Sequence, residues 1–145
     1  MNSNANHKCF IVDDDVFTAN LFEKVVSDYG YTDVTMFTSG VDALNHLHLK
    51  PKVILLDIQM EKLNGFEVLK KIKRVLPDAY IIMVSGQEDM KMALDTLRYG
   101  ALDYVIKNEN ADKEIQKALG KIDVIEERLV KQKPSFFRRM TTVFF

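Results

Sequence analysis

Val53-Ile54-Leu55-Leu56-Asp57-Ile58-Gln59-Met60 is a stretch in which four large apolar residues end abruptly at the carboxylate of Asp57. Pro51 and Lys52 introduce the run. A short, uniformly apolar run is typical of a central parallel strand that is buried on both faces. In open α/β sheets, ligands bind at the carboxyl ends of the strands. The stretch therefore predicts a buried strand that places Asp57 at a candidate site.

Short apolar runs and longer amphipathic segments alternate along the rest of the chain. The apolar runs predict strands at residues 9–12, 34–37, 53–57, 79–84 and 101–106. Helical spacing predicts helices at 16–29, 64–76, 88–99 and about 111–133. A further helix is predicted after Ser39, which can cap it, with Val41, Leu44 and Leu47 on one face. Strands that alternate with helices in this way imply a parallel sheet with right-handed crossovers. The predicted fold is a doubly wound five-stranded α/β domain with helices on both faces and the flavodoxin-like strand order 2-1-3-4-5.

Length and composition are those of one ordinary soluble domain. The chain has 145 residues, of which 47% are hydrophobic and 28% charged, and its net charge is −1. This charge balance gives no reason to expect nucleic-acid binding. Residues 1–8 lack the apolar core of a signal peptide and no apolar run is long enough to span a bilayer, so a cytoplasmic location is expected. The single cysteine, Cys9, is expected in the core.

Polar side chains follow the predicted strands where the strands end. Asp13 and Asp14 follow the first strand, and Asp57 ends the third. Ser85 follows the fourth strand and Lys107 the fifth. Because the carboxyl ends of parallel strands share one edge of the sheet, these groups are expected to be neighbours. Carboxylates that converge there would raise one another's pKa values unless a cation lay among them, and hard oxygen ligands favour Mg²⁺.

These groups are suited to phosphoryl transfer. Lys107 and a metal ion would offset charge on the transferred phosphoryl oxygens, and Ser85 would donate a hydrogen bond to one of them. A carboxylate would attack in line. Asp57 is the predicted nucleophile because it is the single acid on the most buried strand.

Each of these residues also has a simpler explanation when taken alone. Asp13-Asp14-Asp15 can cap the N-terminus of a helix, and Asp57 can be a turn residue. Ser85 has neither a nucleophile-elbow glycine pattern nor a histidine partner. The joint placement at strand ends favours a site. The three histidines are expected to be solvated or structural rather than metal ligands: His7, His46 and His48.

Several motifs occur in the order found in the receiver domain of bacterial two-component response regulators, which the chain resembles over roughly residues 7–124. Ile11-Val12-Asp13-Asp14 resembles the acidic pair of that family. Leu56-Asp57-Ile58-Gln59-Met60, with Gly65, resembles its phosphoacceptor segment. Val84-Ser85-Gly86 matches its hydroxyl position, and Tyr104-Val105-Ile106-Lys107 matches its switch aromatic residue and its lysine.

The resemblance implies a chemical role for each acidic residue. Asp57 would accept a phosphoryl group from a histidine kinase or a histidine phosphotransfer protein. Asp14, Asp57 and the carbonyl group of Gln59 would hold Mg²⁺, and Asp13 would act through water. Lys107 would be the catalytic lysine.

The resemblance also implies residues that read out and time the signal. Ser85 and Tyr104 would form the switch pair that reports phosphorylation to the surface. Gln59 and Gln87 stand at the positions that tune phosphoryl lifetime in the family. Neither of these two residues fixes a rate.

Two positions depart from the family pattern. Proline usually follows the methionine and the lysine, whereas this chain has Glu61 and Asn108. The lysine–proline bond of the family is commonly cis, and a cis bond to Asn108 would cost about 2.5–4 kcal/mol. Lys107 is therefore expected either to be held by a different backbone conformation or to keep a cis bond whose cost is offset by local contacts.

The predicted fourth helix carries two rows of residues with apolar members. The first row is the predicted buried stripe: Met90, Ala93, Leu94 and Leu97. The second row is predicted to point away from the core: Met92, Thr96 and Tyr99. Partners of the receiver family dock on this face, so the second row and Tyr104 form a candidate interface with a downstream protein target. Isolated exposed apolar residues are also common without any partner.

The last predicted helix extends beyond residues 1–124, which are assigned to the receiver domain. Its apolar residues form a short heptad seam, which makes a homodimer through this helix a hypothesis: Ile115, Ala118, Ile122, Ile125 and Leu129. Residues 125–145 are interpreted as a helix extension plus an aromatic and basic tail, with no separate folded output domain. The tail after Pro134 is expected to pack on this chain or on a second copy. A membrane anchor, a docking peptide and the beginning of a further domain are the alternatives.

The predicted function is that of a single-domain response regulator that switches protein contacts and catalyses only its own phosphorylation and dephosphorylation. A haloacid-dehalogenase-like phosphatase is the alternative from an enzyme class, with Asp13 as nucleophile and Asp15 as the second acid. Phe17 stands where that family has threonine or valine, and no late acidic pair or cap domain follows. A receiver-like binding module that is never phosphorylated is the third alternative.

Overall fold

The computed structural model describes the backbone of residues 6–144 and the side chains of residues 6–132. Its centre is a five-stranded parallel sheet in the order β2-β1-β3-β4-β5. The strands are β1 Lys8–Val12, β2 Asp33–Phe37, β3 Val53–Asp57, β4 Tyr80–Ser85 and β5 Asp103–Ile106. The helices are α1 Val16–Tyr29, α2 Gly40–Leu44, α3 Gly65–Val75, α4 Met90–Arg98 and α5 Ala111–Phe144. The predicted fold class and strand order are confirmed.

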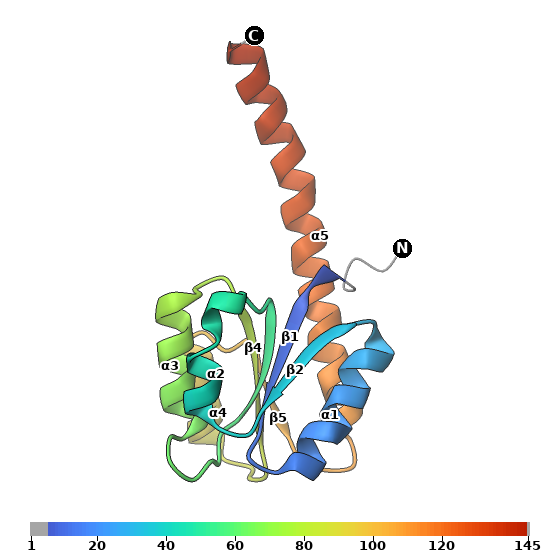
Figure 1. Cartoon of the computed structure of the whole chain (residues 1–145). Coiled ribbons are helices and arrows are strands. Elements are labelled where there is room, and N and C mark those ends of the chain that lie inside the picture. The colour runs from blue at the N-terminus through green and yellow to red at the C-terminus, as the bar shows by residue number, and fades with distance from the viewer. Residues whose placement is uncertain (1–5, 145) are drawn as a thin grey trace.

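The helices cover both faces of the sheet, with α1 and α5 on one side and α2, α3 and α4 on the other (Figure 1). Each side has its own hydrophobic core. The central strand β3 serves both, because successive side chains of a strand point to opposite faces. Leu55 packs in the core beneath α1 and α5, and Leu56 packs in the opposite core. All residues of β3 are buried, as the uniformly apolar run predicts.

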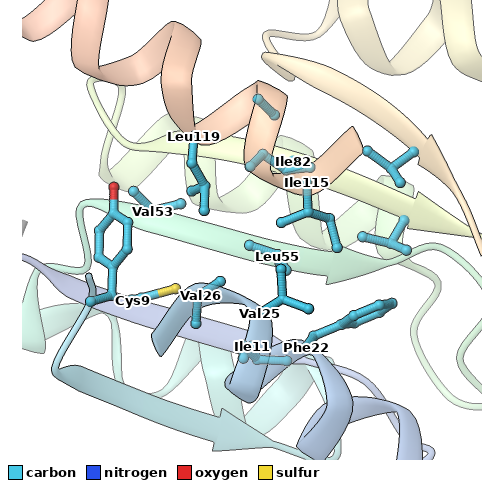
Figure 2. Packing of buried hydrophobic residues seen from close by; sticks show 14 of the residues in the cluster. Cys9, Ile11, Phe22, Val25, Val26, Val53, Leu55, Ile82, Ile115 and Leu119 are labelled. Atoms are coloured by element: carbon cyan, nitrogen blue, oxygen red, sulfur yellow. The ribbon is translucent and has the colours of Figure 1, made fainter. Parts of the chain in front are cut away.

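Figure 2 shows the core between the sheet and helices α1 and α5. Leu55 of the central strand β3 lies close to Val25 of α1, and Ile115 of α5 points from its helix toward the sheet. Cys9 is fully buried in this cluster. Burial raises the pKa of its thiol to about 12, and the nearby charge of Asp33 acts in the same direction. The predicted core position of Cys9 is confirmed, and its thiol stays protonated at neutral pH.

Helix α1 begins and ends where its sequence predicts. The Asp15 carboxylate accepts hydrogen bonds from the Phe17 N–H at 3.1 Å and from the Thr18 hydroxyl at 2.8 Å, which satisfies donors at the helix N-terminus. Gly30 ends the helix with a φ of 129°, a conformation that costs glycine little. The Asp15 carboxylate is therefore engaged as the N-terminal cap of α1.

Helix α2 is shorter than predicted. It is capped by Ser39, as predicted, but it ends at Leu44, and Leu47 begins a separate 3₁₀ turn, Leu47–Leu49. Val41, predicted to share one face with Leu44 and Leu47, is 47% exposed, whereas Leu47 is buried. The small residues Gly40 and Ala43 face the core instead, because α2 lies very close to α3: a Cβ atom at Gly40 would lie 2.5 Å from Val68 Cγ2.

Most members of the two rows of α4 are reversed relative to the prediction, and Tyr99 of the second row is exposed as predicted. Met90, Leu94 and Leu97 are 76%, 48% and 43% exposed, whereas Thr96 is fully buried and Met92 packs against the core. The Thr96 hydroxyl is satisfied by the Ala93 carbonyl at 2.9 Å, which removes the main cost of burying it. Both rows contain apolar residues, and α4 covers only the edge of the sheet beside β5, so periodicity alone did not identify the buried row.

This reversal corrects the candidate interface. Thr96 is inaccessible and Met92 is only partly exposed. The prediction that both residues form an exposed surface is therefore wrong. Tyr99 is 53% exposed, and its ring contacts Phe66 edge-on at 5.1 Å. Tyr104 is half-buried at the same edge.

Helix α5 continues past its predicted end near Lys133, since its backbone is helical to Phe144. The helix leaves the domain partway along its length and stands clear of the sheet (Figure 1). Near this point Glu126 forms an ion pair with Lys52, the residue that precedes β3. The predicted tail after Pro134 lies outside the residues whose side chains are described. None of the described helices combines the length and apolarity needed to cross a membrane.

The predicted heptad seam is divided between two environments. Its first members, Ile115, Ala118 and Ile122, are buried in the core of the domain. Beyond them Ile125 is partly exposed and Leu129 is 45% exposed. Only this second part of the seam is available to a partner.

Candidate functional site

The predicted acidic cluster forms at the carboxyl ends of β1 and β3, where Val12 pairs with Leu56. Carboxylate oxygens of Asp13, Asp14 and Asp57 all lie within 4.8 Å of one another. Asp13 and Asp57 are 1% and 3% exposed, whereas Asp14 is exposed. This is the only group of potential metal-ligating side chains found in the described part of the chain.

Lys107 is held between two of these acids. Its Nζ atom lies 3.0 Å from Asp13 Oδ2 and 3.3 Å from Asp57 Oδ1. Burial lowers the pKa of the Lys107 ammonium, but its bonds to Asp13 and its attraction to Asp57 together outweigh burial, so this pKa lies above its ordinary value. The lysine is therefore charged at neutral pH.

Asp57 is harder to ionise than an ordinary aspartic acid. Burial, and then the neighbouring Asp13 charge, raise its pKa to about 6, although Lys107 and the backbone N–H of Gln59 act in the opposite direction. At neutral pH the carboxylate form predominates. It is available as a nucleophile and carries charge that the single ammonium of Lys107 does not balance.

Asn108 does not prevent Lys107 from reaching the site. The described chain contains no cis peptide bond, so the bond before Asn108 is trans. The Lys107 N–H donates to the Ser85 carbonyl at 2.7 Å, which ties the end of β5 to the end of β4. The lysine is thus held by an ordinary trans backbone.

Ser85 and Tyr104 meet at the loop between β4 and α4. Ser85 is 2% exposed, and its Oγ atom accepts a hydrogen bond from the Gln87 N–H at 3.2 Å. The Tyr104 hydroxyl donates to the Gln87 carbonyl at 3.1 Å. The two predicted switch residues are therefore connected through the backbone of Gln87.

Gln59 contacts both sides of the site. Its backbone N–H donates to Asp57 Oδ1 at 3.2 Å, and its side-chain Oε1 accepts from the Gly86 N–H at 3.3 Å. The second contact was not predicted. Gly86 is visible in the sequence beside Ser85, but no spacing pattern pairs it with a glutamine on another loop.

Gly65 shapes the loop that follows Asp57. A Cβ atom at this position would lie 2.1 Å from the Asp57 carbonyl oxygen, so only glycine fits without displacement. Its N–H donates to the Ile58 carbonyl at 2.8 Å. The start of α3 is thereby packed directly against the residue that carries the central carboxylate.

The donor set fits a divalent cation. Carboxylate and carbonyl oxygens are the ligands that Mg²⁺ prefers, and three clustered carboxylates face one ammonium. Asp13 Oδ2 is buried, and the partner described for it is the Lys107 ammonium at 3.0 Å. His46 and His48 take no part: both are exposed, and the His46 ring is tilted against Phe37 and stacked on His48.

A parallel sheet of this order, with clustered acids, a hydroxyl and a lysine at its carboxyl edge, defines a receiver-type signalling domain. The chain belongs to the response regulator receiver domain family, whose model matches residues 9–119. The family operates in two-component signal transduction.

Relatives and solved structures agree with this assignment. Chemotaxis protein CheY of Listeria monocytogenes is 31% identical over 110 residues, which cover 75% of this chain and 92% of that protein. Transcriptional regulatory protein ZraR of Salmonella typhimurium is 33% identical over 112 residues, which cover 77% of this chain but 25% of that regulator. A CheY-like receiver domain from Methanospirillum hungatei has a TM-score of 0.75 at 25% identity, and the match covers 84% of this chain and 98% of that one.

Proposed function

We propose that this chain is a phosphorylation switch whose Asp57 accepts a phosphoryl group from a histidine kinase or a histidine phosphotransfer protein in a Mg²⁺-dependent reaction. The observation that carries the proposal is the convergence of Asp13, Asp14 and Lys107 on Asp57. Asp13 and Asp14 follow β1 and Lys107 follows β5, and they meet at the acid that ends β3.

The reaction forms an acyl phosphate. An ionised oxygen of Asp57 attacks phosphorus in line, a new O–P bond forms, and the N–P bond of the donor phosphohistidine breaks as the imidazole nitrogen takes up a proton. Lys107 offsets charge on the phosphoryl oxygens, and the Ser85 hydroxyl donates a hydrogen bond to one of them. Asp13, Asp14, Asp57 and the Gln59 carbonyl would hold Mg²⁺, which when bound neutralises charge on the transferred group.

The geometry argues against the phosphatase alternative. That mechanism needs Asp15 beside Asp13 as a second acid in the site. The Asp15 carboxylate is instead engaged by the Phe17 N–H and the Thr18 hydroxyl as the cap of α1. We therefore infer a switch that acts catalytically only on its own phosphorylation and dephosphorylation.

The output of the switch is proposed to be a protein contact. The exposed face of α4 carries Met90, Leu94 and Leu97, and it adjoins Tyr104 at the end of the hydrogen-bond path from Ser85. This face replaces the predicted row as the candidate surface for a downstream protein target. We propose that the chain acts in the cytoplasm as a single-domain regulator.

The extension of α5 is proposed to pair with a second copy. The apolar residues that remain exposed on it include Leu129 at 45% and Val130 at 61%. An isolated helix with an apolar stripe gains stability mainly by burying that stripe. Neither nucleic-acid binding nor membrane contact is favoured, since the chain is close to neutral.

The proposal is tested by incubation with acetyl phosphate and Mg²⁺. We expect an increase in intact mass corresponding to one phosphoryl group, loss of that mass with hydroxylamine, and no reaction in Asp57→Asn. A hydroxylamine-labile adduct that persists in Asp57→Asn but is lost in Asp13→Asn would support the phosphatase instead. Mg²⁺ binding without any adduct would support a binding module that is never phosphorylated.

A further inference from the structure

Gln59 contacts two loops beside the acidic site. Gln59 lies two residues after Asp57, yet its side chain reaches the loop after β4 and accepts the Gly86 N–H at 3.3 Å. Strands β3 and β4 are neighbours, with Asp57 opposite Val84, so Gly86 lies just past the end of the strand beside the nucleophile. One residue thus connects Asp57 to the loop that begins at Ser85.

A side chain at Gly86 would crowd this contact without blocking it. A Cβ atom there would lie 3.3 Å from Gln59 Oε1, so the amide oxygen lies directly over this backbone position. Both residues are exposed, which means that water can replace either partner when the bond opens. The bond is therefore reversible rather than part of the core.

A phosphoryl group on Asp57 would need hydrogen-bond donors, and the site contains few. The carboxylates only accept, and the Lys107 ammonium is already shared between Asp13 and Asp57. The Ser85 Oγ atom accepts from the Gln87 N–H, which leaves its own proton free to donate. The next donor along the chain is the Gly86 N–H, and Gln59 occupies it.

We propose that Gln59 holds the Gly86 N–H in the unphosphorylated chain and must release it to a phosphoryl oxygen when Asp57 is phosphorylated. This inference rests on the function proposed above. Gln59 is then a positioning residue: its side chain competes for a donor and does not touch phosphorus. A charged phosphoryl oxygen is a stronger acceptor than a neutral amide, so the exchange proceeds once the acyl phosphate exists.

The exchange has a direct route to the surface. Gly86 lies three residues before Asp89, whose side chain caps α4 by accepting the Met92 N–H at 3.0 Å. Movement of Gly86 toward Asp57 therefore pulls on the start of α4 and on the Gln87 carbonyl held by Tyr104. Release by Gln59 is the first step of that movement.

The first test uses Gln59→Met, which keeps the length of the side chain but removes the acceptor. In the unphosphorylated protein, without Mg²⁺, the Gly86 amide proton should shift upfield in the variant because it loses its hydrogen bond. Gln116→Met, the same change at an exposed position on α5, is the matched control and should leave the Gly86 signal in place. An unmoved Gly86 signal in Gln59→Met would overturn the proposal.

The second test is a titration with beryllofluoride in the presence of Mg²⁺, followed by the Ser85 and Gly86 amide signals. The affinity of Gln59→Met should exceed that of the wild type about two- to tenfold, because one net hydrogen bond no longer has to be exchanged. If the Gln59 side chain only supported the loop structure, its removal would leave the affinity for beryllofluoride unchanged or lower it. Either result would overturn the proposal. A wild type that does not respond to beryllofluoride at all would instead remove the proposed function and this inference with it.

Discussion

The Lys107 ammonium lies 3.0 Å from Asp13 Oδ2, slightly closer than it lies to the proposed nucleophile Asp57 at 3.3 Å. The lysine therefore compensates the charge of both buried acids at once. Because it is the only ammonium described at this cluster, its removal should expose their mutual repulsion.

Replacing Lys107 with methionine should raise the pKa of Asp57 above its value of about 6, because the principal charge that lowers this pKa is lost. Phosphorylation by acetyl phosphate at neutral pH should slow at least about tenfold, since a group that stabilises developing charge is absent. Lys121→Met is the control, because that ammonium pairs with Asp103 on the surface at 2.8 Å. An unchanged rate in Lys107→Met would contradict the assigned role.

The raised pKa of Asp57 predicts a pH-dependent cost in stability. The ordinary pKa of this side chain is 3.8, so between about pH 4 and pH 6 the folded chain binds the proton more tightly than the unfolded chain. Stability conferred by the protonated acid is lost as the pH rises through about 6. Asp57→Asn should therefore raise the free energy of unfolding by about 1–3 kcal/mol at pH 7.5 in EDTA.

Urea denaturation at two pH values provides the measurement. The advantage of Asp57→Asn should shrink toward pH 4 and disappear below the ordinary pKa of 3.8, where the wild-type acid is protonated in both the folded and the unfolded chain. Added Mg²⁺ should stabilise the wild type more than the variant, because a ligand that binds only the folded state stabilises it. An equal advantage at both pH values would indicate a packing effect instead of a titration.

Two glycine substitutions should have opposite effects on stability. Gly65→Ala would place a Cβ atom 2.1 Å from the Asp57 carbonyl oxygen, so it should destabilise the fold by about 1–3 kcal/mol or more and displace Asp57. Gly120→Ala, within α5, would place its Cβ atom 3.7 Å from the Tyr29 hydroxyl, an ordinary contact. It should stabilise the helix by about 0.5–1 kcal/mol. Thermal unfolding of both variants checks the pair, and similar shifts in Tm would contradict the geometry.

The proposed dimer is tested on the extension of α5. Leu129→Glu places a charge on the exposed part of the seam and should convert a dimer to a monomer in sedimentation equilibrium. Val124→Glu is the matched control: Val124 is 47% exposed, but it lies about 140° around the helix from Leu129 and should leave the dimer intact. A wild type that stays monomeric as its concentration rises would contradict the proposal.

The sheet and most of the site could be predicted because strand ends are marked by residue type. The apolar run 53–56 ends at Asp57, and the run before Ser85 ends equally sharply, so the edge where both lie follows from topology alone. Lys107 reaches the acids as expected, although Asn108 replaces the usual proline. These parts of the structure depend on local pattern and on one general rule about parallel sheets.

Features set by tertiary packing could not be predicted in this way. The two rows of α4 differ little in polarity, and only the position of the helix at the sheet edge decides that Thr96 is buried while Leu94 is exposed. The contact between Gln59 and Gly86 joins two loops, where no periodicity operates. The predicted end of α5 near Lys133 was also wrong, since the helix continues beyond that residue.

The most direct test of the account is the location of the phosphoryl group after reaction with acetyl phosphate and Mg²⁺. Borohydride converts an aspartyl phosphate to homoserine, and peptide mass spectrometry then identifies the residue that reacted. We predict homoserine at position 57 alone, and none when Mg²⁺ is removed with EDTA. Homoserine at Asp13 or Asp14, or none anywhere, would contradict the assignment of Asp57 as the acceptor.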